Sequence, residues 1–411
     1  MAATNYPIGF WNYVSAERQG PEAVRDWADC GMTLAMGPEY SPGSEAAREN
    51  MHGILQEAAS HGIRVIHCHA DTTWRSMTAH GRDEYRRRAE VAVAEFGGYG
   101  SLMGFHVGDE PDLFRKIDYP DVVASFQVLN EIAPRHHHFS NFLPWWLGIE
   151  REIYCPESTY EEHLEKYVTE GGIRQLCYDC YAQMKPAQHG WDQFFRNLRF
   201  YRELGRRLNV PVWTTLLSAG HYDYKAPNEH EYRWQLHAAA AHGMQGVLWF
   251  VFYLREGGGD YHGAPVDEHW ERSLSFEWLS RVNRTFNKSV GPKLMELSHV
   301  ETRHAGRSFG GWPSLAAGDD IVRAVFAQTP FIYSRFTAPG GVPYILLMNN
   351  SPDTATHAYL RISSAVKSLH RVAWEGEERE EAFDARYDAF SEFGKWFMPA
   401  QLELYRVSLV R

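Results

Sequence analysis

Long apolar runs and basic clusters are both missing from this chain of 411 residues. No apolar run approaches the roughly 20 residues that a membrane-spanning helix needs, so we expect no transmembrane segment. Asp and Glu number 52 against 41 Lys and Arg, and the net charge of −11 argues against nucleic acids and anionic membranes as partners. The basic run from Arg86 to Arg88 stands between Glu84 and Glu90, which is typical of a solvated helix face.

Cysteine is scarce as well. The five cysteines are an odd, widely spaced set, which favours reduced thiols over a disulfide framework. Cys177 and Cys180 form a CxxC pair, but they lie in the strand-like run QLCYDCYA, where residues three apart point to opposite faces. The pattern therefore does not favour a redox or zinc site at this pair.

The first residues, MAATNYPIGFWNYV, have neither the basic n-region nor the apolar h-region of a signal peptide. We expect a cytoplasmic location for the chain as printed, and a secreted or periplasmic one if a signal peptide has been removed. The sequence has no low-complexity linker and no solenoid repeat, and nothing in it predicts an oligomeric state.

Aromatic residues, by contrast, are abundant. The chain has 14 Trp, 22 Tyr and 22 Phe, which together make up 14% of it. This is more than a hydrophobic core needs, and it is in keeping with a surface that stacks flat ligands such as sugar rings.

The first part of the chain alternates strand-like and helix-like segments. The strand-like segments are 7–14, 32–38, 63–70, 102–112, 136–144, 174–182, 211–219 and 246–254. The helix-like segments are 21–30, 44–60, 83–96, 120–134, 159–169, 190–208, 228–242 and 268–290. A capping box, Ser158 to Glu161, is expected at the head of the fifth helix. Eight strands alternating with eight helices predict a (β/α)8 TIM barrel over residues 1–299.

After about residue 298 the pattern changes. Segments such as IVRAVFAQ, PFIYSRFTA and VPYILLMNN are strand-like, are separated by Gly, Pro, Asn and Asp, and have no long helix between them. This composition predicts a small antiparallel β-sandwich over residues 300–411, with the boundary between Ser298 and Gly310.

The fourth strand carries the strongest candidate for chemistry. The run LMGFHVGDEPD is apolar as far as Val107 and then delivers Asp109 and Glu110 just before Pro111, which cannot continue a ladder. The carboxyl ends of the strands form the catalytic face of such barrels, so we place Glu110 at the centre of the active site. Asp179, in the buried-looking run CYDCY of the sixth strand, is its candidate partner, since an unpaired buried carboxylate costs several kcal/mol.

Other strand tips supply candidate substrate-binding residues. They are Asn12, Glu39, His69, Asp109, Asn141, Trp145, Tyr181, Trp249 and Tyr253. Every barrel must place polar residues where its strands meet water, so a single one of them indicates little. Asp179 could equally be a structural partner of an Arg or a Tyr, and Trp249 could equally be core.

The chain resembles the glycoside hydrolases of the large (β/α)8 clan, in which a Glu at the end of the fourth strand is the general acid/base. The resemblance rests on the Glu110-Pro111 pair, on the runs NFLPWW, TYEEHLEKYV and CYDCYAQ, and on Trp249 as a sugar platform. The C-terminal runs GGVPYILLMNNS and GKWFMPAQLELYRV are similar to the β-sandwich appended to many of these enzymes. The resemblance implies cleavage of an oligosaccharide or polysaccharide by a pair of carboxylates, with no cofactor and no metal.

The sequence departs from that clan in two places. The clan's nucleophile is a Glu at the end of the seventh strand, but PVWTTLLSAGHY has no carboxylate before Asp223. The Asn that usually precedes the acid/base is replaced by Asp109. Asp179 is therefore the leading candidate for the second carboxylate, with Glu39, Asp71, Glu256 and Asp260 as its rivals.

Two other hypotheses stay open at this point. The missing carboxylate of the seventh strand is also consistent with a non-catalytic carbohydrate-binding protein on a degraded barrel. The other hypothesis is a metal-dependent hydrolase. His67, His69 and Asp71 lie on one face of the third strand, as metal ligands would. They resemble the HxH pair of metal-dependent amidohydrolases, although that pair belongs to the first strand.

Overall fold

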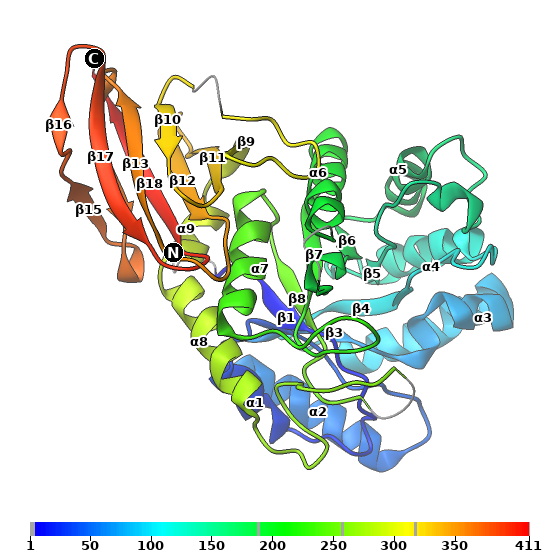
Figure 1. Ribbon diagram of the computed structural model, residues 1–411. Coiled ribbons are helices and arrows are strands. Elements are labelled where there is room, and N and C mark those ends of the chain that lie inside the picture. The colour runs from blue at the N-terminus through cyan, green and yellow to red at the C-terminus, as the bar shows by residue number, and fades with distance from the viewer. Residues whose placement is uncertain (1–4, 187–189, 256–258, 316–318, 411) are drawn as a thin grey trace.

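The computed structural model describes residues 5–186, 190–255, 259–315 and 319–410 and shows a parallel barrel followed by an antiparallel sandwich (Figure 1). The barrel strands are β1 (Ile8–Phe10), β2 (Leu34–Met36), β3 (Arg64–His67), β4 (Leu102–Asp109), β5 (Phe139–Asn141), β6 (Leu176–Asp179), β7 (Val212–Leu217) and β8 (Val247–Phe250). They form two parallel sheets, in the orders β1-β8-β7-β6 and β2-β3-β4-β5. Thr33 N donates to Ile8 O at 2.9 Å and Phe142 N to Cys177 O at 2.8 Å, so backbone hydrogen bonds close both seams. The predicted fold class is confirmed.

Helices surround this barrel. They are α1 (Ala23–Asp29), α2 (Glu45–Ser60), α3 (Trp74–Phe96), α4 (Tyr119–Ile132), α5 (Tyr160–Gly171), α6 (Gly190–Leu208), α7 (Glu229–Ala241), α8 (Leu274–Lys288) and α9 (Val290–Met295). Short 3-10 turns are η1 (Ala70–Thr72), η2 (Ile149–Arg151), η3 (Ala182–Met184) and η4 (Trp374–Gly376). Where the sequence predicted one helix over 83–96, helical structure starts earlier and continues across Gly81, whose φ of 76° is not helical.

The cap of α5 corrects the sequence prediction by one residue. Thr159, not Ser158, has extended backbone and accepts a hydrogen bond from Glu162 N at 3.2 Å. The two positions offer the same side-chain chemistry, so the sequence alone did not distinguish them.

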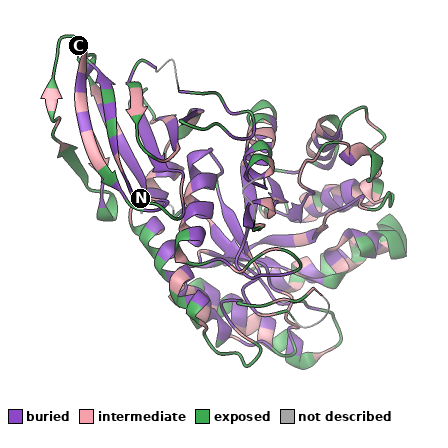
Figure 2. Cartoon of the chain, in the orientation of Figure 1, coloured by how far each residue is buried: buried purple, intermediate pink, exposed green. Residues whose placement is uncertain are grey.

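Alternating residues of the barrel strands face two different layers. The barrel interior is a cluster of Trp11, Leu34, Met36, Ile66, Met103, Phe139, Cys177, Trp213 and Leu248. The neighbours of these residues along the strands point outward and pack against the helices, so the strands are buried on both faces (Figure 2). Cys177 and Cys180 belong to the inner and the outer cluster respectively, as their spacing predicted.

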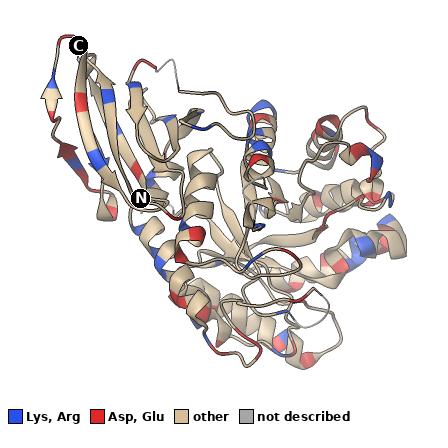
Figure 3. Cartoon of the chain, in the orientation of Figure 1, with Lys and Arg blue, Asp and Glu red and all other residues tan. Residues whose placement is uncertain are grey.

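Basic and acidic residues are interspersed along the helices, as in α3 (Figure 3). Arg86 pairs with Glu131, and Glu84 accepts hydrogen bonds from both Arg87 and Arg88. The basic run of α3 is therefore neutralised locally. In the described part of the chain no helix combines the length and the apolar character that crossing a membrane requires.

The sandwich follows from Ser298 onward. Its strands are β9 (Ser298–Ala305), β10 (Val322–Phe326), β11 (Phe331–Thr337), β12 (Pro343–Asn349), β13 (Thr356–Ser363), β14 (Val366–Val372), β15 (Glu378–Glu381), β16 (Ala385–Arg386), β17 (Phe390–Phe397) and β18 (Leu402–Leu409). They form a six-stranded sheet, β15-β14-β18-β12-β11-β9, and a four-stranded sheet, β10-β13-β17-β16. The apolar residues between the two sheets, such as Phe331, Leu360 and Phe393, make a core of their own.

The six-stranded sheet packs against the barrel through α7 (Figure 1). The indole nitrogen of Trp234, on α7, donates to Asn350 Oδ1 at 2.8 Å, and His237 Nδ1 donates to Ala400 O at 2.8 Å. Leu346 and Ile332 of the sheet belong to the same apolar cluster as the outer layer of the barrel. The two parts of the chain therefore share one continuous core.

Candidate active site

The tip of β4 owes its position to a close approach that only glycine permits. A Cβ on Gly108 would lie 1.6 Å from Cζ3 of Trp74, so any side chain there would collide with the indole ring. Ser140 Oγ donates to Gly108 O at 2.8 Å, and Glu110 N donates to Asn141 O at 2.9 Å, which ties the tip to β5. Glu110 has a φ of 47°, in the left-handed region that costs a residue with a side chain about 1 kcal/mol. Backbone strain of this kind clusters at active sites, where a side chain is held in one orientation.

Three carboxyl groups meet at this tip. Glu110 and Asp179 lie close enough for each to shift the pKa of the other, through charge and hydrogen bonding. The amide nitrogen of Asn141 donates to Asp179 Oδ1 at 2.7 Å and to Asp109 Oδ1 at 3.1 Å, so this one side chain bridges the other two acids. The amide oxygen of Asn141 is buried and has no partner among the described residues. The structure thus brings together four residues that the sequence singled out.

Burial dominates the electrostatics of this cluster. It raises the pKa of Glu110 to about 9, and the charges of Asp179 and Asp109 add to the effect. Burial and the charge of Asp109 raise the pKa of Asp179 to about 7. Burial also raises the pKa of Asp109 to about 6, although the hydrogen bond from Asn141 and the charges of Arg75 and Arg255 oppose this. Glu110 is therefore the group that keeps its proton most firmly.

Aromatic rings surround the carboxyl groups. Tyr181 stacks on Phe250 with ring centroids 5.4 Å apart and meets His221 edge-on at 5.6 Å. Tyr13 lies beneath the guanidinium of Arg255, whose carbon is 4.1 Å from the ring centroid. The charges of Asp109 and Asp179 help to raise the pKa of Tyr13, after burial itself, which shows how near the ring lies to them.

A cavity of about 290 Å³ opens beside this aromatic wall. It is lined by Tyr13, Val14, Ser15, Arg18, Glu39, Tyr253, Leu254, Arg255, Asp267, Glu268 and Trp270. Trp270 is 43% exposed, and the guanidinium carbon of Arg18 lies 5.6 Å from its ring centroid. An exposed indole and several charged groups around one cavity suit a polar ligand with a flat apolar face.

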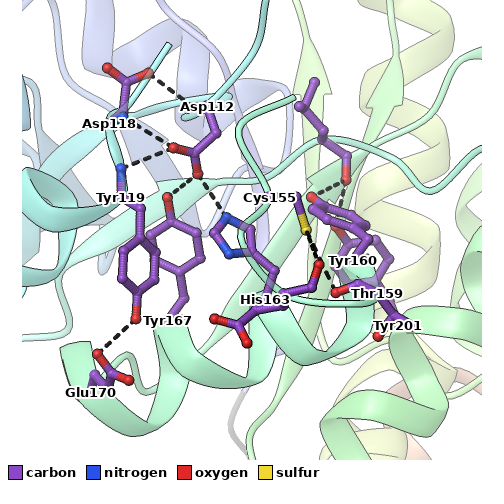
Figure 4. A network of polar contacts seen from close by, with 12 residues as sticks. Asp112, Asp118, Tyr119, Cys155, Thr159, Tyr160, His163, Tyr167, Glu170 and Tyr201 are labelled. Carbon is purple, nitrogen blue, oxygen red and sulfur yellow. Dashed lines mark hydrogen bonds and ion pairs between the residues drawn. The ribbon is translucent and has the colours of Figure 1, made fainter. Parts of the chain in front are cut away.

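A buried aspartate anchors the segment that follows Glu110 (Figure 4). Asp112 is 1% exposed, and its Oδ1 accepts hydrogen bonds from Asp118 N at 3.1 Å and Tyr119 N at 2.9 Å. Its Oδ2 accepts from His163 Nε2 at 3.0 Å and from the Tyr167 hydroxyl. One carboxylate thus caps the start of α4 and fastens it to α5, and it holds the chain two residues after Glu110.

Trp249 does not occupy the position expected of a sugar platform. Its ring is fully buried, and its indole nitrogen donates to Asn283 Oδ1 of α8 at 3.2 Å. The ring therefore faces the helices, and the next residue, Phe250, faces the barrel interior and Tyr181. The prediction was wrong because every residue of GVLWFVFYL is apolar, so the run does not reveal which face of the strand points inward.

Two further candidates serve the structure. His69 is 3% exposed, packs against Tyr40, and accepts a hydrogen bond from Asp71 N at 3.1 Å. Asn12 is 2% exposed, donates to Gln19 Oε1 at 2.6 Å and accepts from Val14 N at 3.0 Å. Both lie at strand tips as expected, but their polar atoms hold turns of the chain.

The remaining candidates are dispersed. Glu39 lines the cavity, and partial burial raises its pKa against the opposing charge of Arg255. Tyr253 also reaches the cavity, but its hydroxyl accepts from the Trp27 indole of α1 at 2.7 Å. The ring contacts of Trp145 are with α6, at Arg196 and Phe200, rather than with the carboxyl groups.

The rivals of Asp179 lie elsewhere. Asp71 pairs with Arg88 at 3.1 Å, Asp260 is exposed, and Glu256 lies outside the described residues. His67 is buried against Phe96, whose ring centroid is 4.6 Å away. Within the described ranges, no group of three or more His, Cys, Asp and Glu side chains is arranged to hold a metal ion.

Sequence reasoning missed Tyr13, Phe250, Arg255 and Trp270. A signal existed for Tyr13, which is two residues after Trp11 and so shares its inward face, and the two rings are stacked with centroids 6.1 Å apart. No local pattern marks Arg255 or Trp270, because both lie in the long connection between β8 and α8, whose course depends on the tertiary fold.

No protein-family model matches the chain, and no curated protein matches it in sequence. Solved structures do resemble it. A family 39 glycoside hydrolase from the gut symbiont Bacteroides cellulosilyticus WH2 aligns with a TM-score of 0.55 at 12% identity, over 98% of this chain and 81% of that one. A family 5 glycoside hydrolase from Bacteroides vulgatus ATCC 8482 aligns with a TM-score of 0.54 at 11% identity, over 98% of this chain and 89% of that one.

The β-galactosidase of the psychrophilic Marinomonas ef1 aligns with a TM-score of 0.54 at 12% identity, over 73% of this chain. The alignment spans 63% of that enzyme, which is therefore considerably longer than the shared part. These likenesses show that the chain has the fold of glycoside hydrolases with a barrel and an appended sandwich. They confirm the predicted resemblance at the level of the fold.

Replacing Asp112 by Asn should lower the free energy of unfolding by about 2–4 kcal/mol, because an amide nitrogen would face the donors His163 and Tyr167 in a buried site. Urea denaturation followed by circular dichroism measures the change. Asp83→Asn, at an exposed position of α3, is the control and should change stability by less than about 0.5 kcal/mol. Equal stabilities of the two variants would contradict the anchoring role of Asp112.

The contribution of the three carboxyl groups to stability should fall as the pH rises from about 4 to 9. Each of them binds its proton more firmly in the folded state than in the unfolded state, because the folded pKa values of Asp109, Asp179 and Glu110 lie above the unfolded values near 4. Glu110→Gln removes the highest of these pKa values, so its melting temperature should exceed that of the parent by a margin that grows from pH 5 to pH 9. Asp223→Asn is the control, since the pKa of Asp223 is lowered by Lys185 and the group stays ionised throughout. A margin that does not change with pH would contradict the burial of a protonated Glu110.

Proposed function

We propose that the protein is a glycoside hydrolase that cleaves an oligosaccharide or polysaccharide with Glu110 as general acid and Asp179 as the second carboxylate. The observation that carries the proposal is the convergence of these residues at the C-terminal ends of β4 and β6, where the amide of Asn141 bridges Asp179 and the neighbour of Glu110, Asp109. Chemistry in such barrels takes place at this face. The fold shared with glycoside hydrolases supports the same conclusion.

The two carboxyl groups are suited to different roles. The raised pKa of Glu110 keeps it protonated at neutral pH, as a group that must donate a proton to the leaving oxygen requires. Asp179 loses its proton more readily, and the amide of Asn141 stabilises its charged form. Asp109 adds a second negative charge that discourages ionisation of Glu110.

We propose a retaining mechanism, in which one carboxyl group attacks the sugar directly. Retaining glycosidases hold their carboxyl groups about 5–5.5 Å apart and inverting ones about 6.5–9.5 Å, the latter with a water between them. The influence of the two groups on each other's pKa supports the shorter separation. In the first step Asp179 would attack the anomeric carbon while Glu110 gives its proton to the departing oxygen. In the second step Glu110 would take a proton from the water that displaces Asp179.

Substrate binding would use the groups around the pair. The amide oxygen of Asn141, which lacks a partner within the described ranges, would accept a hydrogen bond from a sugar hydroxyl. Tyr181 and Phe250 offer ring faces at the reacting subsite, and the cavity with Tyr13 and Trp270 offers a neighbouring subsite. Aromatic faces with charged groups at their edges are suited to pyranose rings.

A non-catalytic carbohydrate-binding protein is the second candidate. It is favoured by β7, the strand VWTTLL, which is buried throughout and carries no carboxylate. Measured hydrolysis of any glycan that depends on Glu110 would exclude it.

Glu110→Gln keeps the shape of the side chain but removes the proton donor, so turnover of a natural glycan should fall by about 10²–10⁴-fold. Aryl glycosides with good leaving groups should be affected less in the first step, because they need little protonation. The control is Asp223→Asn, which alters the first carboxylate after β7 and should keep parental activity. Unchanged glycan turnover by Glu110→Gln would mean that the assignment of the acid is wrong.

Asp179→Ala should be inactive on glycans and should regain activity with added azide. Removing a nucleophile leaves space for a small anion, which can attack the anomeric carbon and leave as a glycosyl azide. A product whose anomer is inverted relative to the substrate identifies Asp179 as the nucleophile, provided that the parent enzyme retains configuration. If Asp179→Ala kept near-parental activity, Asp179 would not be the second carboxylate.

A further inference from the structure

The outer face of the four-stranded sheet in the sandwich is unusually aromatic. Trp396 is 65% exposed, Tyr359 is 59% exposed and Phe326 is 51% exposed. They lie on β17, β13 and β10, three adjacent strands of one sheet, and along most of β13 and β17 exposed and half-buried residues alternate with buried ones (Figure 2). An exposed group of large rings on one sheet face is a sign of an interaction surface.

The strand register makes these rings contiguous. His357 is paired with Trp396 across β13 and β17, and Phe326 with Tyr359 across β10 and β13. Ring centroids are 5.4 Å apart between His357 and Trp396 and 4.3 Å apart between His357 and Tyr359. The rings thus form a band over three strands, about 10 Å across at the usual strand spacing.

Glycine keeps the middle of this band open. Gly394 stands opposite Tyr359 on β17, and a Cβ there would lie 3.3 Å from Cδ1 of Tyr359 and 2.9 Å from Cε1 of His357. With no side chain at this position, the two rings settle over the backbone of the neighbouring strand. The result is a shallow aromatic platform rather than a set of separate rings.

Charged groups border the platform. Arg361 lies between Phe326 and Phe390, with its guanidinium carbon 5.3 Å and 4.9 Å from their ring centroids. Glu392 stands opposite Arg361 in the register of β13 and β17, on the same face of the sheet. The buried centres of protein–protein interfaces are depleted in charged residues, so this mixture is unlike one. It suits a sugar chain, which presents flat C–H faces to aromatic rings and hydroxyl groups to charged side chains.

The polar edges of the platform are available for such hydroxyls. Among the described residues, neither the indole N–H of Trp396 nor the hydroxyl of Tyr359 makes a hydrogen bond. Buried tyrosine and tryptophan usually have a partner, and exposed ones are positioned to find one in a ligand.

We propose that the platform formed by Phe326, His357, Tyr359, Arg361, Phe390 and Trp396 is a second glycan-binding surface that holds a polysaccharide chain away from the catalytic face. The choice of a polysaccharide over other flat ligands rests on the proposed function. The surface lies on the sheet turned away from the barrel (Figure 1), so it would keep the enzyme on a polymer without competing for the active site.

The test uses the full chain with Glu110→Gln, so that no polymer is cleaved during the measurement. Native affinity electrophoresis in gels containing laminarin, xylan, glucomannan or galactan detects binding as slower migration. We expect at least one polymer to retard the protein, and the added pair Trp396→Ala with Tyr359→Ala to weaken that binding by about tenfold. Trp374→Ala is the matched control, because Trp374 is 54% exposed in η4 and is not part of the platform.

Thermal denaturation checks that the double variant is folded, and Tyr359→Ala alone replaces it if it is not. In the protein with Glu110 intact, the platform variants should keep parental kcat/KM on a soluble aryl glycoside and lose activity on insoluble polymer. Undiminished retardation of the platform variants, or retardation by none of the four polymers, would overturn the inference while leaving the proposed function intact.

Two further outcomes separate the proposals. If the parent forms a dimer that Trp396→Ala dissociates, the platform is covered by a second copy of the chain and the glycan inference is overturned. If the platform binds polymer but the parent hydrolyses none, the second glycan-binding surface stands and the proposed catalytic function fails.

Discussion

The close approach of half-buried carboxyl groups at the ends of β4 and β6 is the constraint on which the candidate site depends. Like charges brought together repel, and partial removal from water penalises each of them, so the folded barrel must supply the free energy that holds them in place. It does so through rigid elements: the ladder of β4 with β5, the close packing of Gly108 on Trp74, and the amide of Asn141 between two acids. The protons that these groups keep reduce the charge repulsion and the cost of removing the carboxyl groups from water.

Much of the fold was predictable because strands and helices differ in the spacing of their apolar residues and in the Gly and Pro residues that end them. The eight parallel strands and the antiparallel C-terminal part follow from apolar runs bounded by Gly and Pro. The positions of Glu110, Asp179 and Asn141 followed from the rule that strand tips converge at one face of the barrel. The contact among them needed no knowledge of side-chain direction, since each is the last or nearly the last residue of its strand.

The errors have a common physical origin. Trp249 and Phe250 are adjacent in a run that is apolar throughout, so pattern alone cannot separate the residue facing the barrel from the one facing α8. His69 and Asn12 are at strand tips, yet neighbouring backbone groups take up their hydrogen-bonding atoms. Arg255 and Trp270 reach the site from loops, whose paths are set by contacts distant in sequence and leave no periodic trace.

Helix α7 has one more consequence, for the history of the two parts of the chain. An ordinary barrel helix presents an apolar stripe to the strands and a polar face to water, but α7 is buried on nearly every side, including Trp234 and the run Ala238–Ala241. Its outer side is covered by the six-stranded sheet. A chain that carried the barrel alone would expose the apolar outer side of this helix to water. The sandwich is therefore not a separable module, and a descendant that lost it would need polar residues in place of the apolar ones on the outer side of α7.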